Sequence, residues 1–396
     1  MSNTTNKWQA LALVTGILFI AANLRVPFTG IAPVLPLIQN HFGLSITAVG
    51  LLNSLPLLAF AAFSPLSAPI ARRFGLERTL FGALLMISAG ILLRSAGSIW
   101  ALYAGTILIG TGIALGNVLL PGLIKRDFSS NVASMTGAYS ITMGAAGAVG
   151  SAMIIPLTQL WSWNIALALI AIAPLFALIL WLPQLKKHHQ QTLPGPKKSA
   201  AVAVWTSPLA WQVTLFMGLN AMPFYVAVGW LPAILADSGI SSAKAGTVHG
   251  MLQLTTAIPG LLLAATLRRL KDQKLAAVSV SLLTALSLIG IVYAPGLAML
   301  WAAILGFGSG ASMMLGLTFI GLRTKNAGDA AALSGMAQCV GYLMAAIGPL
   351  LLGKVHDWSG GWAMPLLVTA AIAVAGACTG MAAGRNAHLE PASSLS

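Results

Sequence analysis

Charged side chains are scarce in this chain. They make up 7% of its 396 residues, and Asp and Glu together number only seven. A typical soluble domain carries about 25% charged residues to keep its surface in water. With 58% hydrophobic residues and a mean hydropathy of +0.88, this chain cannot cover a water-facing surface of its size. The composition excludes a soluble globular protein and indicates that lipid is the main solvent.

Cysteine and the usual signatures of enzyme chemistry are also nearly absent. The two cysteines, Cys339 and Cys378, lie inside apolar segments, so we expect small core residues and neither a disulfide framework nor a metal site. The sequence has no nucleotide-binding loop of the Gly-x-x-x-x-Gly-Lys-Ser/Thr type, no catalytic triad and no metal-spaced His/Cys cluster. We therefore expect no cofactor and no ATP hydrolysis, and an integral-membrane enzyme is a less favoured alternative.

Basic residues outnumber acidic ones, with 21 Lys and Arg and a formal net charge of +14. In a soluble protein this excess would favour nucleic-acid binding. Here the basic residues form short clusters between apolar runs, where insertion topology and anionic lipid account for them. We therefore expect a lipid bilayer, and no nucleic acid, as the partner.

Long apolar runs fill most of the chain, and a spanning helix needs about 20 mostly apolar residues. The first run, from Trp8 to Leu37, is too long for a cleavable signal peptide and contains Arg25, so we interpret it as a spanning helix. The runs predict an all-α integral membrane protein with twelve transmembrane helices, at 9–37, 46–71, 79–97, 100–124, 131–156, 163–183, 208–235, 242–267, 275–294, 297–322, 329–353 and 361–383. The polar, basic stretch 184–206 is a predicted linker loop between an N-terminal half, 1–183, and a C-terminal half, 207–396.

The distribution of Lys and Arg predicts the orientation, because cytoplasmic loops carry an excess of them. With the N-terminus inside, 17 of the 21 fall on the cytoplasmic side, and only Lys244 and Lys354 fall in outer loops. We expect both termini and the 184–206 loop to be cytoplasmic, and the protein to be a multi-pass monomer of a bacterial inner membrane.

The two halves repeat each other at a nearly constant spacing. Matches at a shift of 196 residues are Pro27-Phe28 with Pro223-Phe224, Pro36 with Pro232, Gly50 with Gly246, Arg72-Arg73 with Arg268-Arg269, and Gly110 and Gly112 with Gly306 and Gly308. The shift becomes 198 for Gly137 with Gly335 and Gly150 with Gly348. This register predicts two pseudo-symmetric six-helix bundles in the same orientation, related by a two-fold axis along the membrane normal.

The segment from Ala68 to Arg78 resembles the loop signature of the major facilitator superfamily, Gly-x-x-x-Asp-Arg-x-Gly-Arg-Lys. Arg73 and Gly75 match its Arg and second Gly, whereas Ala68 and Arg72 replace its first Gly and its Asp. The resemblance implies the major facilitator fold and makes Arg72, Arg73, Gly75 and Arg78 candidates for a conformational loop motif.

Three further segments, 23–36, 116–128 and 136–140, resemble the cyanate-porter branch of that superfamily, which includes cyanate-permease-like and nitroimidazole-transporter-like proteins. The likeness runs over essentially the whole chain, and the nitroimidazole-transporter-like members match more closely. It implies a secondary active transporter of a small polar or anionic solute, working by alternating access around a site at mid-membrane. An exporter of small uncharged drugs is the alternative, and a non-transporting sensor fits poorly because no signalling domain is visible.

Arg25 lies near the middle of the first predicted helix, where a charge is costly unless it faces a polar cavity or a partner. No Asp or Glu lies deep inside a predicted helix. The resemblance places Arg25 in the central cavity, which the first, fourth, seventh and tenth helices line. We predict that it binds the solute. The alternative is a structural arginine bonded to backbone carbonyls freed by Pro27 and Pro33.

Amide and phenol side chains in the predicted helices are the other candidates for substrate binding, because they can donate and accept hydrogen bonds. Each could instead bond a neighbouring helix. They are Asn53, Asn117, Tyr139, Asn220, Gln253, Gln338 and Tyr342. His249 is a candidate for proton coupling, because histidine titrates near neutral pH; the alternative is a satisfied polar residue near the membrane interface.

Overall fold

The computed structural model describes residues 2–128, 131–186, 204–262, 271–325 and 327–389. These residues form helices joined by short turns, and none of them lies in a strand. Eleven helical segments in this part of the chain are long and apolar enough to span a membrane. Lipid favours this architecture, because a helix satisfies its backbone hydrogen bonds within itself.

The first half consists of a broken helix followed by long ones. Its α-helices are α1 (Ser2–Asn23), α2 (Val26–Thr29), α3 (Leu35–Phe42), α4 (Ile46–Phe74), α5 (Leu76–Arg94), α6 (Ile99–Asp127), α7 (Val132–Leu160), α8 (Trp163–Leu169) and α9 (Ile172–Trp181), with 3₁₀ turns η1 (Ala32–Val34) and η2 (Leu182–Lys186). Serines begin two of the long helices: Ser45 and Ser98 accept the backbone N–H of Ala48 and Ala101. Gly43 and Gly75 mark turns at positive φ, which glycine adopts without strain.

The second half has the same plan. It comprises α11 (Pro208–Asp237), α12 (Ser242–Thr255), α13 (Ile258–Leu262), α15 (Lys274–Tyr293), α16 (Ala298–Arg323), α17 (Ala327–Ser359) and α18 (Ala363–Ala383), with η3 (Pro295–Leu297). The predicted eighth helix, 242–267, corresponds to α12 and α13, and its last residues, 263–267, lie outside the described residues. The predicted linker is described only at its ends, because 187–203 also lie outside them.

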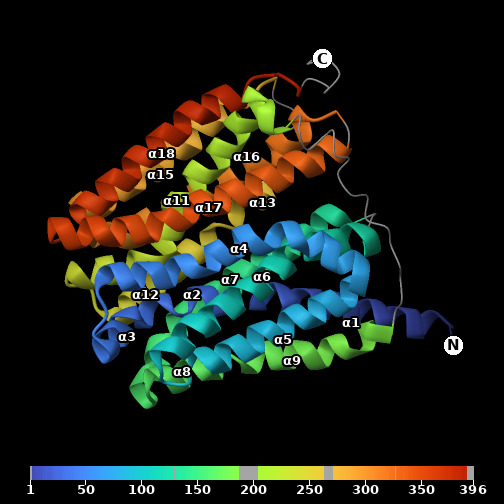
Figure 1. The fold of residues 1–396 in the computed structure, drawn as a ribbon, viewed down its shortest axis with the longest axis horizontal. Helices are drawn as coiled ribbons and strands as arrows, with labels where there is room; N and C mark the ends of the chain where they lie inside the picture. The colour runs from blue at the N-terminus through green and yellow to red at the C-terminus, as the bar shows by residue number, and fades with distance from the viewer. Residues whose placement is uncertain (1, 129–130, 187–203, 263–270, 326, 390–396) are drawn as a thin grey trace.

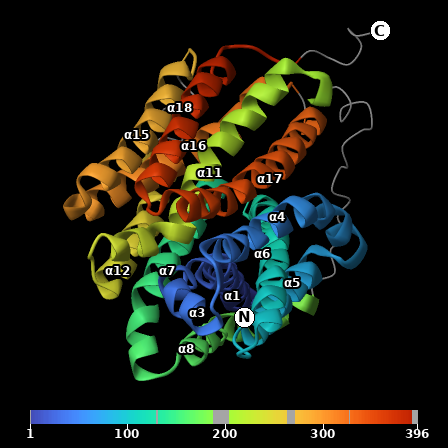
Figure 2. The same cartoon turned by 60° about the vertical axis from the view of Figure 1, so that its left-hand side comes forward.

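The two halves form two bundles that lie side by side (Figure 1). Helices α1 to α9 make one bundle and α11 to α18 the other, and the turned view separates them in the same way (Figure 2). The bundles meet along two helix pairs, α4 with α17 and α7 with α12. We call the end where α1 begins and α18 ends the termini side, and the end where α4 begins and α17 ends the opposite side (Figure 1).

Matching contacts confirm the two-fold duplication that the repeats predict. A Cβ added at Gly50 on α4 would lie 2.7 Å from the Pro349 oxygen on α17, and one added at Gly246 on α12 would lie 2.9 Å from the Ser151 oxygen on α7. Gly50 and Gly246 are 196 residues apart, and Ser151 and Pro349 are 198 apart. One close contact between the halves is therefore the two-fold copy of the other, and a small residue in each allows the helices to approach.

The first helix breaks in mid-course, whereas its counterpart does not. Its regular turns stop after Asn23, restart at Val26 and pass through η1 before α3, so that Pro27 and Pro33 sit in the broken stretch. Proline lacks a backbone N–H and favours such breaks. The counterpart α11 contains Pro223 and Pro232 but remains one helix. The break is thus present in the first helix and not in α11.

Candidate functional site

Arg25 sits at the break in the first helix and points toward the other bundle. It is the N-cap residue of α2, and its side chain makes no capping hydrogen bond. The stem of its side chain lies against α7, since a Cβ added at Gly147 would be 2.8 Å from Arg25 Cγ. Its guanidinium carbon lies 5.1 Å from the centre of the Phe224 ring on α11. Arg25 therefore bridges the two bundles halfway along the first helix.

Aromatic side chains from both bundles surround this guanidinium. Tyr139, Tyr225 and Tyr342 all interact with it electrostatically. Tyr225 and Tyr342 also hydrogen-bond to each other, with ring centres 6.4 Å apart. The ring of Tyr225 on α11 meets that of Phe28 on α2 edge to face, with ring centres 5.8 Å apart. The site is a partly aromatic cluster with one cation.

The cation has no acidic counterpart in the described part of the chain. No ion pair there involves Arg25, and no carboxylate interacts with it electrostatically. Its Nε is buried without a hydrogen-bond partner. The Arg25 side chain as a whole is half-buried, at the break between α1 and α2. An uncompensated cation with unused donors is suited to a solute that brings acceptors or negative charge.

A chain of buried polar groups continues from Arg25 toward the opposite side. Gln253 packs next to Arg25 across Gly147, with its Oε1 unpaired. Its Nε2 lies 3.3 Å from His249 Nε2, and His249 Nδ1 lies 2.9 Å from the Ser151 hydroxyl on α7. His249 and Gln253 are both fully buried. His249 is thus enclosed in protein at the junction of the two bundles.

The remaining candidates divide between the site and other places. Tyr342 and Gln338 lie one turn apart on α17, and Gln338 donates a hydrogen bond of 3.0 Å to Ser334. Asn117 on α6 is half-buried, and its side chain makes no hydrogen bond with a described residue. Asn53 lies nearer the opposite side, where its amide donates to the Gly229 oxygen at 3.3 Å and so joins α4 to α11.

Asn220 lies apart from the cluster, in the interior of the second bundle. Its Nδ2 donates to the Phe216 oxygen at 2.9 Å, and its Oδ1 accepts from Ser281 at 2.8 Å and from Ser312 at 3.4 Å. These contacts join α11 to α15 and α16. They match the inter-helix alternative of the sequence analysis and leave Asn220 away from Arg25.

Among the described residues, the side-chain hydrogen bonds between the bundles lie between the level of Arg25 and the opposite side. Thr47 donates to Asp357 there through its hydroxyl, at 2.6 Å, and through its backbone N–H, at 3.1 Å. The Asn53 and His249 bonds lie between this pair and the Arg25 cluster. These hydrogen bonds therefore join the bundles from the opposite side as far as the Arg25 cluster.

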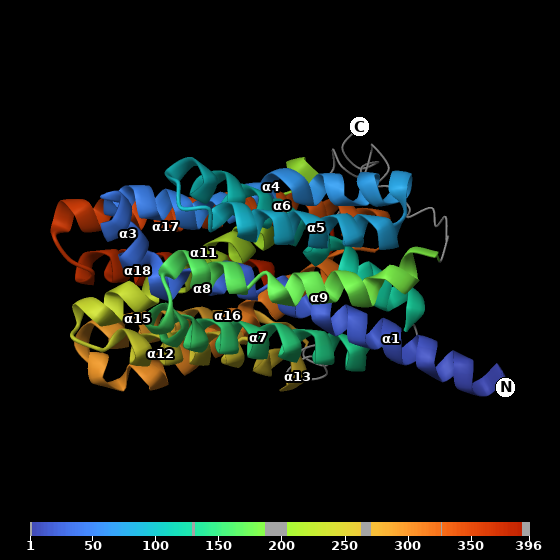
Figure 3. The same ribbon diagram turned by 90° about the horizontal axis from the view of Figure 1, so that it is seen from below.

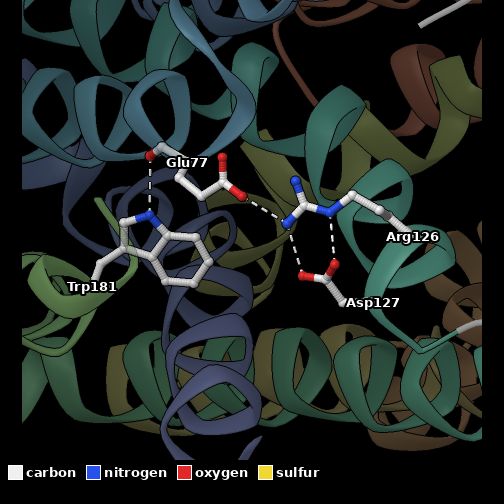
Figure 4. A network of polar contacts seen from close by, with 4 residues as sticks. All are labelled: Glu77, Arg126, Asp127 and Trp181. Atoms are coloured by element: carbon white, nitrogen blue, oxygen red, sulfur yellow. Dashed lines mark hydrogen bonds and ion pairs between the residues drawn. The ribbon is translucent and has the colours of Figure 1, made fainter. Parts of the chain in front are cut away.

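Beside the predicted loop motif of the first half lies a charge pair that the sequence analysis did not identify. Arg72, Arg73 and Arg78 are exposed. The acidic residue is Glu77 at the start of α5, whose Oε1 lies 2.6 Å from Arg126 Nη2 at the end of α6 (Figure 4). Asp127 binds the same guanidinium through two hydrogen bonds, and the Trp181 indole donates to the Glu77 backbone oxygen (Figure 4).

A hydrogen-bonded pair occupies the corresponding positions in the second half, with a glutamine in place of the glutamate. Arg323 Nη2 donates to Gln273 Oε1 at 2.7 Å. Gln273 lies 196 residues after Glu77, and Arg323 lies 197 after Arg126. The repeat register therefore contained a signal for the pair: each half places a long polar side chain at the start of its third helix and an arginine at the end of its fourth.

Arg94 is a buried cation beside the same break, to which the sequence analysis gave no role. It ends α5, is 1% exposed, and its Nη1 donates to the Pro27 backbone oxygen at 2.7 Å. Arg94 thus makes a backbone contact at this break, of the kind that was the alternative for Arg25, whereas the Arg25 side chain makes no hydrogen bond with a described residue.

Comparisons with known proteins agree with this architecture. The family model of the Major Facilitator Superfamily matches residues 11–349. The chain is 54% identical over 380 residues to the 2-nitroimidazole transporter of Escherichia coli, covering 96% of this chain and 97% of that protein. It is 26% identical over 355 residues to the cyanate transport protein of the same organism, covering 88% and 91%. A solved bacterial homologue of the human lysosomal transporter Spinster shares the fold, with a TM-score of 0.78 at 18% identity over 96% of this chain and 97% of the other.

Proposed function

The chain belongs to the Major Facilitator Superfamily, and from this premise we propose that it carries a small planar solute with polar or anionic oxygens, bound at Arg25. It is a multi-pass secondary transporter and not an enzyme. The observation that carries the substrate proposal is the uncompensated guanidinium of Arg25 among aromatic rings of both bundles.

A planar solute suits both parts of the site. A guanidinium donates two parallel hydrogen bonds to a planar pair of oxygens, as in a carboxylate or a nitro group. The flat rings of Phe224, Tyr225 and Tyr342 favour stacking or edge contacts with a heteroaromatic ring. The 54% identical relative is named for 2-nitroimidazole, a compound that combines such a ring with such a group. A nitroimidazole is therefore our first candidate, and a small anion such as cyanate is the second.

Alternating access around Arg25 would use the two bundles as moving units. The hydrogen bonds from Thr47, Asn53 and Ser151 to the second bundle tie the bundles together on the opposite side. Breaking these contacts, with new ones forming on the termini side, would transfer the site from one side to the other. From the excess of Lys and Arg we propose that the termini side is cytoplasmic, in a bacterial inner membrane, and that the 184–206 loop links the halves there. The transporter would act as a monomer.

Proton coupling through His249 is a subsidiary proposal. Its ring hydrogen-bonds to Ser151 of the first bundle and to Gln253, which packs beside Arg25. Protonation would convert both ring nitrogens to donors and so change these bonds. Vesicles with the wild-type protein should show proton movement that accompanies solute uptake. Loss of this proton movement in His249→Gln would support the coupling.

The function is tested by uptake and efflux in vesicles that contain the purified protein. The panel is a 2-nitroimidazole, cyanate, nitrate and formate, with a small uncharged drug to represent the alternative exporter. We expect saturable transport of the nitroimidazole or of an anion, with competition by the other members that carry paired oxygens. Transport of the uncharged drug alone, unaffected by every anion, would favour the exporter and contradict the proposal.

A further inference from the structure

Arg94 carries more donors than the protein satisfies. Its Nη1 donates to the Pro27 oxygen, but its Nε and Nη2 are buried and have no hydrogen-bond partner among the described residues. No carboxylate of the described residues pairs with it or interacts with it electrostatically. Burying an uncompensated cation costs several kcal/mol even after relaxation. Binding one neutral carbonyl leaves most of this cost in place.

A small internal cavity lies beside this guanidinium. It measures about 10 Å³, and its lining includes Arg94, Phe28, Asn53 and Thr106. A cavity of this order holds a single particle about the size of a water molecule or a small ion. The cavity therefore has room for one small ligand and for no larger solute.

Among the lining residues, Arg94 supplies the unused hydrogen-bond donors. Asn53 uses its amide to donate to the Gly229 oxygen, and the Thr106 hydroxyl donates to the Leu102 oxygen. The cavity contains no acidic side chain. A water molecule could accept hydrogen bonds from Arg94 but would leave its charge uncompensated, whereas a monovalent anion would do both.

We propose that this cavity binds a single small monovalent anion of halide size, held by the Nε–H and Nη2–H groups of Arg94. The site lies within the first bundle, between α2, α4, α5 and α6, and is distinct from the cluster at Arg25, which faces α7 and α11. The anion and Pro27 share one guanidinium, so the anion stabilises the broken first helix. The site does not depend on the proposed substrate.

The test is thermal unfolding of the purified full-length protein in detergent, at constant ionic strength, with chloride exchanged for gluconate. We expect the unfolding temperature to rise saturably with chloride, and bromide to replace chloride. Arg94→Gln, which removes the guanidinium and its charge, should abolish the chloride-dependent shift. Arg25→Gln is the matched control and should keep it, since Arg25 belongs to the other site.

Crystals of the wild-type protein grown in bromide provide a second measurement that does not depend on a variant folding. Anomalous density beside Arg94 is the expected result. The proposal is overturned if bromide gives no peak there, if gluconate and chloride give the same unfolding temperature, or if the shift survives in Arg94→Gln. Loss of the shift in Arg25→Gln would also overturn it, because the anion would then bind at the transport site. None of these measurements uses transport, so they stand apart from the test of the proposed function.

Discussion

Replacing Arg25 by lysine keeps the positive charge and removes the planar guanidinium with its paired hydrogen-bond donors. A guanidinium can give a planar solute two parallel hydrogen bonds while it lies 5.1 Å from the Phe224 ring, whereas an ammonium is a point donor. Losing one hydrogen bond to a charged group costs about 1.5–3 kcal/mol. At 1.36 kcal/mol for each factor of ten, kcat/KM for transport should fall about 10- to 150-fold. Arg25→Ala should lose at least as much, because it removes the charge as well.

The assay is uptake into vesicles at matched protein content, with the substrate identified from the panel. Insertion should be normal in Arg25→Lys, because arginine and lysine have similar insertion costs at the centre of a helix. Arg385→Lys is the control, since it makes the same change at an exposed position beyond α18. Wild-type rate and affinity in Arg25→Lys would show that the arginine has a structural role and would refute the cavity-site reasoning.

Three other substitutions test neighbouring parts of the structure. Gly147→Ala should reduce transport, because the added Cβ would lie 2.8 Å from Arg25 Cγ and would displace this side chain. Gly82→Ala is the control: a Cβ there has nothing within 4 Å, and the variant should transport normally in the same uptake assay. Asn220→Ala should lower stability by about 0.5–2 kcal/mol in denaturant unfolding and leave KM unchanged, because its bonds lie inside the second bundle. Arg126→Gln should cost about 3 kcal/mol by leaving Glu77 buried and unpaired, and unfolding equal to wild type would contradict the pairing seen in Figure 4.

The helices and their duplication could be predicted from the sequence because lipid imposes simple rules. Each span must be a long apolar run, so the runs themselves located the segments. Close helix contacts need small residues, so glycines such as Gly50 and Gly246 preserved the register between the halves. The view from below shows the resulting helices running side by side along the molecule (Figure 3). The cation in mid-helix, Arg25, was also evident, since a charge stands out in an apolar run.

The partners of the polar residues were decided only by the tertiary structure. Most faces of these helices are apolar, so the sequence carries little periodic signal for the rotation of each helix about its axis. That rotation directs Asn220 into its own bundle and Gln253 toward Arg25. It also brings Arg94, 67 residues further along the chain, to the backbone carbonyl of Pro27 at the break. The sequence therefore showed that Arg25 and Arg94 lie within apolar runs, and packing across distant segments determined that Arg94 binds the backbone and that Arg25 faces the interface between the bundles.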